Sequence, residues 1–225
     1  MKKLIILILS IAALHTNAQK ATAKILSTTE INKIFDDELK TYNHISYPIF
    51  RAYQYINNKQ LCYLLLTESI DGVKGKDTSS KNLKAFVFKD KTGVLEKELE
   101  IIDNINPALN EEYTISFWTK YSSFEKDGNN TVPIIVYGTK AMNNYMDGRI
   151  KIIIVYNNKK IVIRHQNAVL DGERITNIDK AFYTLPIVIQ NAVKTKITAM
   201  EKADNAILAN DWEKAMLQKK VVIKG

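Results

Sequence analysis

The stretch IKIIIVYNNKKIVIRHQ, residues 150–166, is the strongest indication of how this chain folds. Its first half is apolar at consecutive positions and rich in isoleucine, which is typical of a central strand covered on both faces. Asn157-Asn158-Lys159 then supplies turn-forming residues before a second run of β-branched residues. The stretch therefore predicts a β-hairpin whose first strand lies inside a sheet.

The same pattern of two strands around a polar turn occurs twice earlier in the chain. The two further hairpins are predicted at residues 49–67, with a turn at 57–59, and at residues 83–102, with a turn at 90–93. Residues 96–101 could alternatively be helical. Additional strands are expected at 113–121 and 132–138, and exposed polar loops at 71–81 and 124–130.

Helices are expected near both ends of the chain. Ser27 and Glu30 have the spacing of a capping box, which predicts a helix over 28–40. Pro186 suits the first turn of a second helix, whose apolar face recurs at helical spacing up to Met200. A short helix near 210–216 and a strand at 221–223 follow. We therefore expect an α+β fold, mainly antiparallel β-sheet built from hairpins with an N-terminal helix and C-terminal helices.

The N-terminus has the features of a cleavable signal peptide. Lys2 and Lys3 precede the apolar run Leu4–Leu14, and small residues at positions 16 and 18 suit cleavage after Ala18. The apolar run is shorter than the roughly 20 residues that span a bilayer. The sequence thus predicts a signal peptide at 1–18, a single domain at 19–225, no stable membrane anchor after cleavage, and a periplasmic or secreted protein.

Charge and cysteine content narrow the possible partners. The net charge of +8 falls to +6 when Lys2 and Lys3 leave with the signal peptide, and the remaining charge is dispersed. Nucleic-acid binders usually concentrate basic residues on one face, so we expect no nucleic-acid partner. Cys62, the single cysteine, lies in an apolar run and is expected to be a buried thiol.

The motifs of common catalytic, nucleotide and zinc sites are absent from the sequence, so we expect no cofactor and no metal. His165 ends an apolar strand face beside a loop that carries Asp171 and Glu173. Such a histidine can act as an acid or base. It can equally be a histidine held by hydrogen bonds at the edge of the core, and we favour this second interpretation.

Other polar and aromatic residues complete the candidate functional cluster. Asp147 could pair with Asp171 or Glu173 as in glycoside hydrolysis, although Asp-Gly pairs are ordinary turn formers. Aromatic rings could stack on sugars, but at strand spacing they are more often core residues. The candidate cluster comprises His165, Arg164, Asp147, Arg149, Asp171, Glu173, Trp118, Tyr121 and Tyr137.

Several segments resemble a family of exported bacterial proteins named for surface polysaccharide biosynthesis. They are YPIFRAY (47–53), LLLTES (64–69), FWTKY (117–121), PIIVYGT (133–139), DGR (147–149) and IRHQN (163–167). Members of that family have an acidic loop before the proline strand. Here residues 125–131 are poorer in carboxylates, which argues against a calcium site and for a plain turn.

The resemblance implies a role in making or displaying cell-surface polysaccharide, and it supplies no catalytic residue. We therefore expect an exported, non-enzymatic factor that binds glycan or a cell-envelope protein. Two alternatives stay open from the sequence. One is a glycan-modifying enzyme that uses His165 with nearby carboxylates, and the other is an inhibitor of a cell-wall hydrolase.

Overall fold

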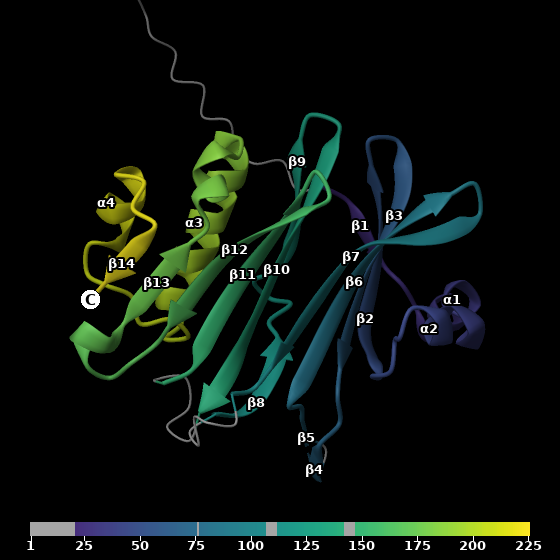
Figure 1. Cartoon of the computed structure of the whole chain (residues 1–225), viewed down its shortest axis with the longest axis horizontal. Coiled ribbons are helices and arrows are strands. Elements are labelled where there is room, and N and C mark those ends of the chain that lie inside the picture. The colour runs from purple at the N-terminus through teal and green to yellow at the C-terminus, as the bar shows by residue number, and fades with distance from the viewer. Residues whose placement is uncertain (1–20, 76, 107–111, 142–146) are drawn as a thin grey trace, which may run out of the picture.

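The computed structural model describes residues 21–75, 77–106, 112–141 and 147–225, and these form four layers (Figure 1). Two antiparallel sheets pack face to face in the middle, and helices cover the outer face of each sheet. The expected class, mainly antiparallel β-sheet with a few helices, is confirmed. The predicted signal peptide at 1–18 lies outside the described residues.

The five-stranded sheet contains the first two predicted hairpins. Its strands lie in the order β1-β2-β3-β6-β7. They are β1 (Ala23–Ile25), β2 (Ile49–Asn57), β3 (Gln60–Glu68), β6 (Asn82–Lys91) and β7 (Val94–Asn104). The segment with the alternative helical interpretation, 96–101, is part of edge strand β7. Within the expected loop at 71–81, β4 (Gly72–Lys74) and β5 (Asp77–Ser79) form a small separate hairpin.

The seven-stranded sheet has the order β14-β13-β12-β11-β10-β8, and β9 pairs with β10 beside β8. Its strands are β8 (Glu112–Phe117), β9 (Ser123–Asp127), β10 (Asn130–Ala141), β11 (Arg149–Tyr156), β12 (Lys159–Gln166), β13 (Ile175–Ile178) and β14 (Val222–Lys224). β8 and β9 pair with successive halves of the long strand β10. The prediction of a polar loop at 124–130 is therefore wrong, because most of this segment forms strand β9.

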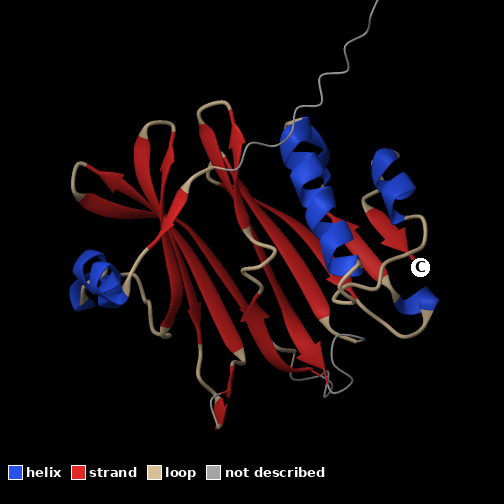
Figure 2. Cartoon of the chain, turned by 180° about the vertical axis from the view of Figure 1, so that it is seen from behind, coloured by secondary structure: helices blue, strands red, loops and turns tan. Residues whose placement is uncertain are grey.

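The helices lie on the outside of the two sheets (Figure 2). They are α1 (Thr28–Ile34), α2 (Asp37–Tyr42), α3 (Ile187–Glu201) and α4 (Trp212–Leu217), with short 3₁₀ turns at Asp171–Glu173 and Lys180–Thr184. Ser27 caps α1 with the predicted capping box. The single helix expected at 28–40 is two helices, because Asp36 accepts a hydrogen bond from the backbone N–H of Leu39 and starts α2.

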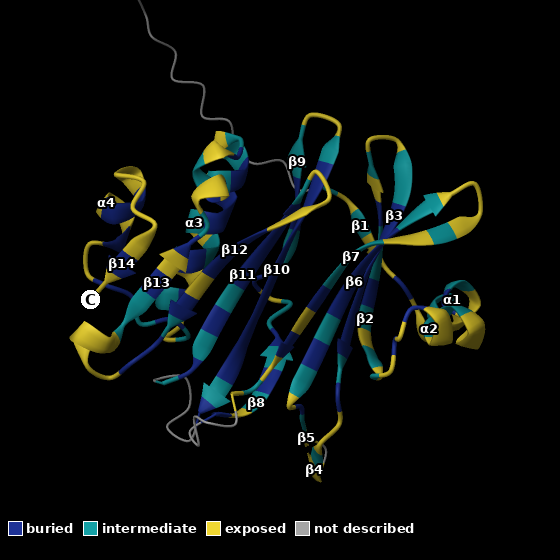
Figure 3. Cartoon of the chain, in the orientation of Figure 1, coloured by how far each residue is buried: buried dark blue, intermediate teal, exposed yellow. Residues whose placement is uncertain are grey.

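Both central sheets are buried on two faces, which explains their continuous apolar sequences (Figure 3). On β11, Ile152 and Ile154 pack under α3, whereas Ile153 and Val155 face the five-stranded sheet. On β3, Leu64 faces the other sheet and Leu65 faces α1 and α2. Burying such a side chain contributes about 1.5–3 kcal/mol. The predicted central strand at 150–156 is confirmed.

Asparagine turns close the hairpins at one end of the sandwich. Asn157 and Asn158 have φ values of 49° and 58°, the left-handed conformation that a two-residue hairpin turn requires and that asparagine tolerates. Asn58 has a φ of 50° in the turn between β2 and β3. Since the strands of each hairpin run antiparallel, these turns and the β9–β10 turn all lie at the same end of the molecule (Figure 1).

Candidate functional site

His165 is a buried structural residue. Its side chain projects from β12 toward α3, among apolar residues, and the residue is 6% exposed. Nδ1 lies 2.8 Å from Oγ1 of Thr176, and Nε2 lies 2.8 Å from Oδ1 of Asn167. Burial lowers the pKa of His165 to about 4, although the hydrogen bond to Asn167 acts in the opposite direction. The imidazole is neutral at physiological pH and has both nitrogens engaged.

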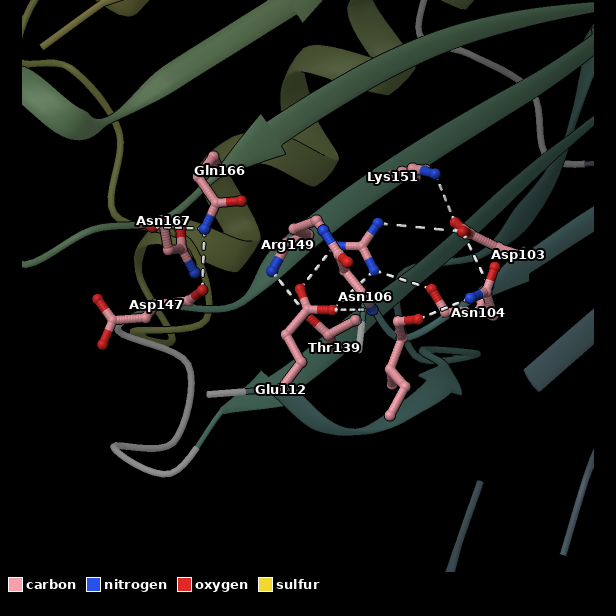
Figure 4. Close-up of polar contacts among 11 residues, drawn as sticks. Asp103, Asn104, Asn106, Glu112, Thr139, Asp147, Arg149, Lys151, Gln166 and Asn167 are labelled. Atoms are coloured by element: carbon pink, nitrogen blue, oxygen red, sulfur yellow. Dashed lines mark hydrogen bonds and ion pairs between the residues drawn. The ribbon is translucent and has the colours of Figure 1, made fainter. Parts of the chain in front are cut away.

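Arg149 lies on the other face of the same sheet, at the end opposite the asparagine turns. Figure 4 shows its contacts with Glu112 and with neighbouring residues. Its guanidinium forms a bidentate pair with Glu112, with Nε–Oε1 of 2.6 Å and Nη2–Oε2 of 2.8 Å. The Glu112 carboxylate also accepts hydrogen bonds from the Thr139 hydroxyl at 2.9 Å and from the backbone N–H of Asn106 at 2.9 Å. The Glu112 side chain is 1% exposed, so this is a buried ion pair.

Asp103, at the end of β7, joins this cluster from the other sheet. Its carboxylate lies 2.6 Å from Nζ of Lys151 and 4.0 Å from the guanidinium of Arg149. Burial raises the pKa of Tyr137, and its hydroxyl donates to Asp103, which raises it further. These contacts connect the two sheets of the sandwich at this end.

The Glu112 carboxylate stays ionised within this ion-pair cluster, which comprises Asp103, Glu112, Tyr137, Arg149 and Lys151. Burial alone would raise the pKa of Glu112, but hydrogen bonds from Arg149 and Asn106 hold it below its usual value of 4.5. The pKa of Arg149 is raised by Glu112 against the opposing effect of burial. A carboxylate that stays ionised beside a permanent cation stabilises this end of the seven-stranded sheet and does not act as an acid or base at neutral pH.

The structure places the remaining charged candidates apart from one another. The carboxylate of Asp147 points away from Arg149, and the backbone carbonyl of Asp147 accepts a hydrogen bond from Gln166 at 2.8 Å (Figure 4). Asp171 and Glu173 lie in an exposed 3₁₀ turn, where Asp171 pairs with Arg174. Arg164 pairs with Asp179 at 3.0 Å on the surface. The carboxylate arrangement expected of a glycosidase is not formed by these residues.

The three aromatic candidates are core residues. Trp118 and Tyr121 lie in the connection between β8 and β9 and pack on the side covered by α3, with ring centroids 6.2 Å apart. Tyr137 lies between the sheets and is 2% exposed. The candidate cluster therefore divides between two faces of the seven-stranded sheet and does not form one pocket. Arg149 and Tyr137 lie together in the ion-pair cluster, whereas Trp118 and Tyr121 contact each other on the opposite face.

A cavity of about 270 Å³ lies at the opposite end of the sandwich, among the hairpin turns. The apolar core between the sheets ends here, and short polar side chains take its place. The wall is rich in amides and also contains two tyrosines, Cys62 and two charged residues. The amide and charged residues that line it are Asn57, Asn58, Gln60, Asn130, Asn157, Asn158, Lys89 and Glu98.

Hydrogen bonds between hairpins position several of these amides. Oδ1 of Asn57 accepts from the backbone N–H of Thr131 at 2.9 Å, and Nδ2 of Asn58 donates to Oδ1 of Asn130 at 2.6 Å. Nδ2 of Asn158 donates to the carboxylate of Glu98. Among the described residues, the Nδ2 groups of Asn57 and Asn130 have no hydrogen-bond acceptor. The cavity thus presents oriented amide donors together with a cation and a carboxylate.

Sequence reasoning missed both the ion-pair cluster and the cavity. A usable indication for the cavity was the repeated Asn-Asn pair, which occurs at 57–58, 129–130 and 157–158; a fourth pair, at 143–144, lies outside the described residues. Each pair lies at or next to a predicted turn, and turns of antiparallel hairpins can meet at one end of a sandwich. Nothing in the sequence connects Glu112 with Arg149.

Comparison with known proteins adds no relative. No family model matches the chain, and no curated protein and no solved structure matches it. Within the described ranges, no helix is long and apolar enough to cross a bilayer. Those ranges also contain no group of three or more His, Cys, Asp or Glu side chains placed to hold a metal ion.

Proposed function

We propose that this chain is an exported, non-enzymatic factor that supports the biosynthesis or display of cell-surface polysaccharide by binding glycan in the cavity at the asparagine turns. The observation that carries the proposal is the lining of that cavity. Sugars present many hydroxyl groups that both donate and accept hydrogen bonds, and carboxamide side chains match them because they offer a donor and an acceptor together. Two sequence features support export and the link to polysaccharide: the signal-peptide pattern at 1–18 and the segments that resemble the surface polysaccharide biosynthesis family.

The size of the cavity favours a short ligand. Pockets that hold drug-sized molecules usually have volumes of about 300–1,000 Å³. A cavity of about 270 Å³ accommodates one sugar unit, such as a chain end or a side branch, and not a long segment. The hairpins that form it are tied to one another by side-chain hydrogen bonds, so little ordering is needed when a ligand binds.

An enzymatic role has less support. The glycan-modifying alternative depends on His165 as the acid or base, and this residue is buried under α3 with both ring nitrogens hydrogen-bonded. It also lies on the opposite face of the sheet from Arg149 and Arg164. We therefore do not include catalysis in the proposal.

The direct test is an NMR titration of the mature chain with surface polysaccharide purified from the producing strain. We expect chemical-shift changes at the turns around Asn57, Asn130 and Asn157, and none at strand β13, which does not line the cavity. Asn130→Ala should weaken binding several-fold, because it removes a cavity amide and the acceptor that positions Asn58. Asn177→Ala, at an exposed position on β13, is the matched control and should bind normally.

Deletion of the gene tests the biological part of the proposal. We expect the amount or composition of surface polysaccharide to change, and the change to be reversed by the wild-type gene. Unchanged polysaccharide in the deletion strain would contradict the proposed role, whatever the purified protein binds.

A further inference from the structure

Lys89 occupies an unusual position in the cavity wall. It lies on β6 two residues after Val87, so its side chain projects from the same face, toward the other sheet. Its partner in the strand register is Cys62, and both residues line the cavity. Lys89, a half-buried residue, therefore lies where the apolar core between the sheets ends.

The other lysines of the β6–β7 hairpin differ from Lys89. Lys84 lies 3.7 Å from Glu100, Lys97 lies 3.0 Å from the same carboxylate, and Lys91 pairs with Glu96. Within the part of the chain that the structure describes, Lys89 has no ion pair and no hydrogen-bond acceptor. Glu98 lines the same cavity, but the two groups are not within ion-pair distance.

The charge of Lys89 acts directly on the cavity wall. Burial raises the pKa of the Cys62 thiol to about 11, and the positive charge of Lys89 acts in the opposite direction. A cation that has no counter-ion and lies in the wall of a cavity attracts an anionic ligand. Ammonium–carboxylate hydrogen bonds are also among the strongest polar contacts available to a ligand.

We propose that the cavity binds a sugar unit that carries a carboxylate, such as a uronic acid, with this carboxylate held by the ammonium group of Lys89. This inference rests on the proposed glycan-binding function and specifies the class of sugar. The amides of Asn57 and Asn130 donate to ring hydroxyls. The carboxylate of Glu98, oriented by Asn158, accepts from a hydroxyl and repels the acidic group, so the sugar binds with its carboxylate directed toward Lys89.

The test compares sugars that differ in a single group. NMR titrations of the mature chain use sodium glucuronate against glucose, and sodium galacturonate against galactose. We expect at least one uronate to bind about tenfold or more tightly than its neutral partner, because a hydrogen bond to a charged group is stronger than one between neutral groups. The preference should weaken as the salt concentration rises.

Variants of Lys89 identify the group responsible. Lys89→Met keeps the length of the side chain and should abolish the preference for the uronate, whereas Lys89→Arg should keep most of it. Lys214→Met, at an exposed position on α4, is the control for the loss of one positive charge and should behave like the wild type. Thermal unfolding of each variant checks that it is folded.

The outcomes separate this inference from the proposed function. Equal binding of neutral and acidic sugars, or a uronate preference that survives in Lys89→Met, would overturn the inference and leave the glycan site standing. If neither the sugars nor the purified polysaccharide shifts the cavity resonances, both the inference and the proposed site are wrong.

Discussion

The buried pair of Arg149 and Glu112 allows a stability prediction that follows from its geometry. Arg149→Met removes two short hydrogen bonds and the counter-ion from a carboxylate whose side chain is 1% exposed. Thr139 and the backbone of Asn106 continue to donate to that carboxylate, but neither carries a positive charge. The variant therefore leaves an uncompensated buried charge between the two sheets.

The expected loss is large for one substitution. Removing one partner of a buried ion pair typically costs about 3–5 kcal/mol. The urea m-value increases with chain length, and with a value of about 3 kcal/mol/M the unfolding midpoint should fall by roughly 1–2 M. The exposed pair of Arg164 and Asp179 provides the control, because exposed pairs contribute about 0–1 kcal/mol and Arg164→Met should move the midpoint little.

A double-mutant cycle separates the pair from other effects of the substitution. Glu112→Gln combined with Arg149→Met removes both charges, so the double variant should be more stable than Arg149→Met alone. We expect a coupling energy of about 1–3 kcal/mol from urea unfolding monitored by circular dichroism. A loss below about 1 kcal/mol in Arg149→Met, or additive single losses, would refute the argument that this buried pair stabilises the fold.

The same pair determines how stability responds to acid. Hydrogen bonds from Arg149 and Asn106 outweigh burial and hold the pKa of Glu112 below 4.5, so the pair contributes fully above the unfolded-state pKa. The contribution is lost as the pH falls through the folded-state pKa. The stability difference between wild type and Arg149→Met should therefore narrow below about pH 4.

Three further predictions concern other parts of the fold. Burial lowers the pKa of His165 from 6.5 to about 4, so between these pH values the unfolded chain binds a proton that the folded chain does not. The free energy of unfolding should therefore decrease by roughly 1.4 kcal/mol for each pH unit as the pH falls from 6.5 to 4. Urea unfolding of His165→Gln across this range should lack this contribution to the pH dependence. Ile154→Ala should cost about 2–5 kcal/mol because Ile154 is 0% exposed, whereas Ile102→Ala, at a residue that is 62% exposed, should cost about 0.5 kcal/mol or less by the same assay. Gly138→Ala would place a Cβ 2.6 Å from the ring of Trp118 and 2.7 Å from the backbone oxygen of Arg149. The substitution should therefore lower the free energy of unfolding by about 1–3 kcal/mol and change the tryptophan fluorescence. An unchanged fluorescence spectrum would contradict this packing.

The local parts of the fold were predictable from the sequence. Asparagine turns flanked by β-branched runs identified the hairpins at 49–67 and 150–166, because both the turn conformation and the strand preference depend on residues close together in the chain. The apolar run at 150–156 also indicated burial on both faces. The capping box at Ser27 and Glu30 correctly marked the start of α1.

The errors occurred where pairing with distant residues decides the conformation. The polar segment at 124–130 looked like a loop, yet most of it forms edge strand β9, because the long strand β10 offers unpaired backbone groups next to β8. The helix expected at 28–40 is divided at Asp36, whose side chain can start a new helix as readily as it can lie within one.

The candidate functional residues also show that contacts between residues distant in the sequence were not predictable. His165 and Arg164 are adjacent in the sequence but lie on opposite faces of β12, since successive side chains of a strand alternate. Glu112 and Arg149 are far apart in the sequence and form the best-connected ion pair. Proximity along the chain was therefore a poor guide to proximity in the site.

The sequence by itself determined most of the strands, the hairpin turns and the two-sided burial of the central strands, because backbone conformation and apolar periodicity are local properties. Only the tertiary structure decided which residues meet: the packing of two sheets brought Asp103 to Lys151 and gathered the asparagine turns around Lys89. The physical reason is that contacts between sheets depend on how two twisted surfaces align, and no short stretch of sequence encodes that alignment.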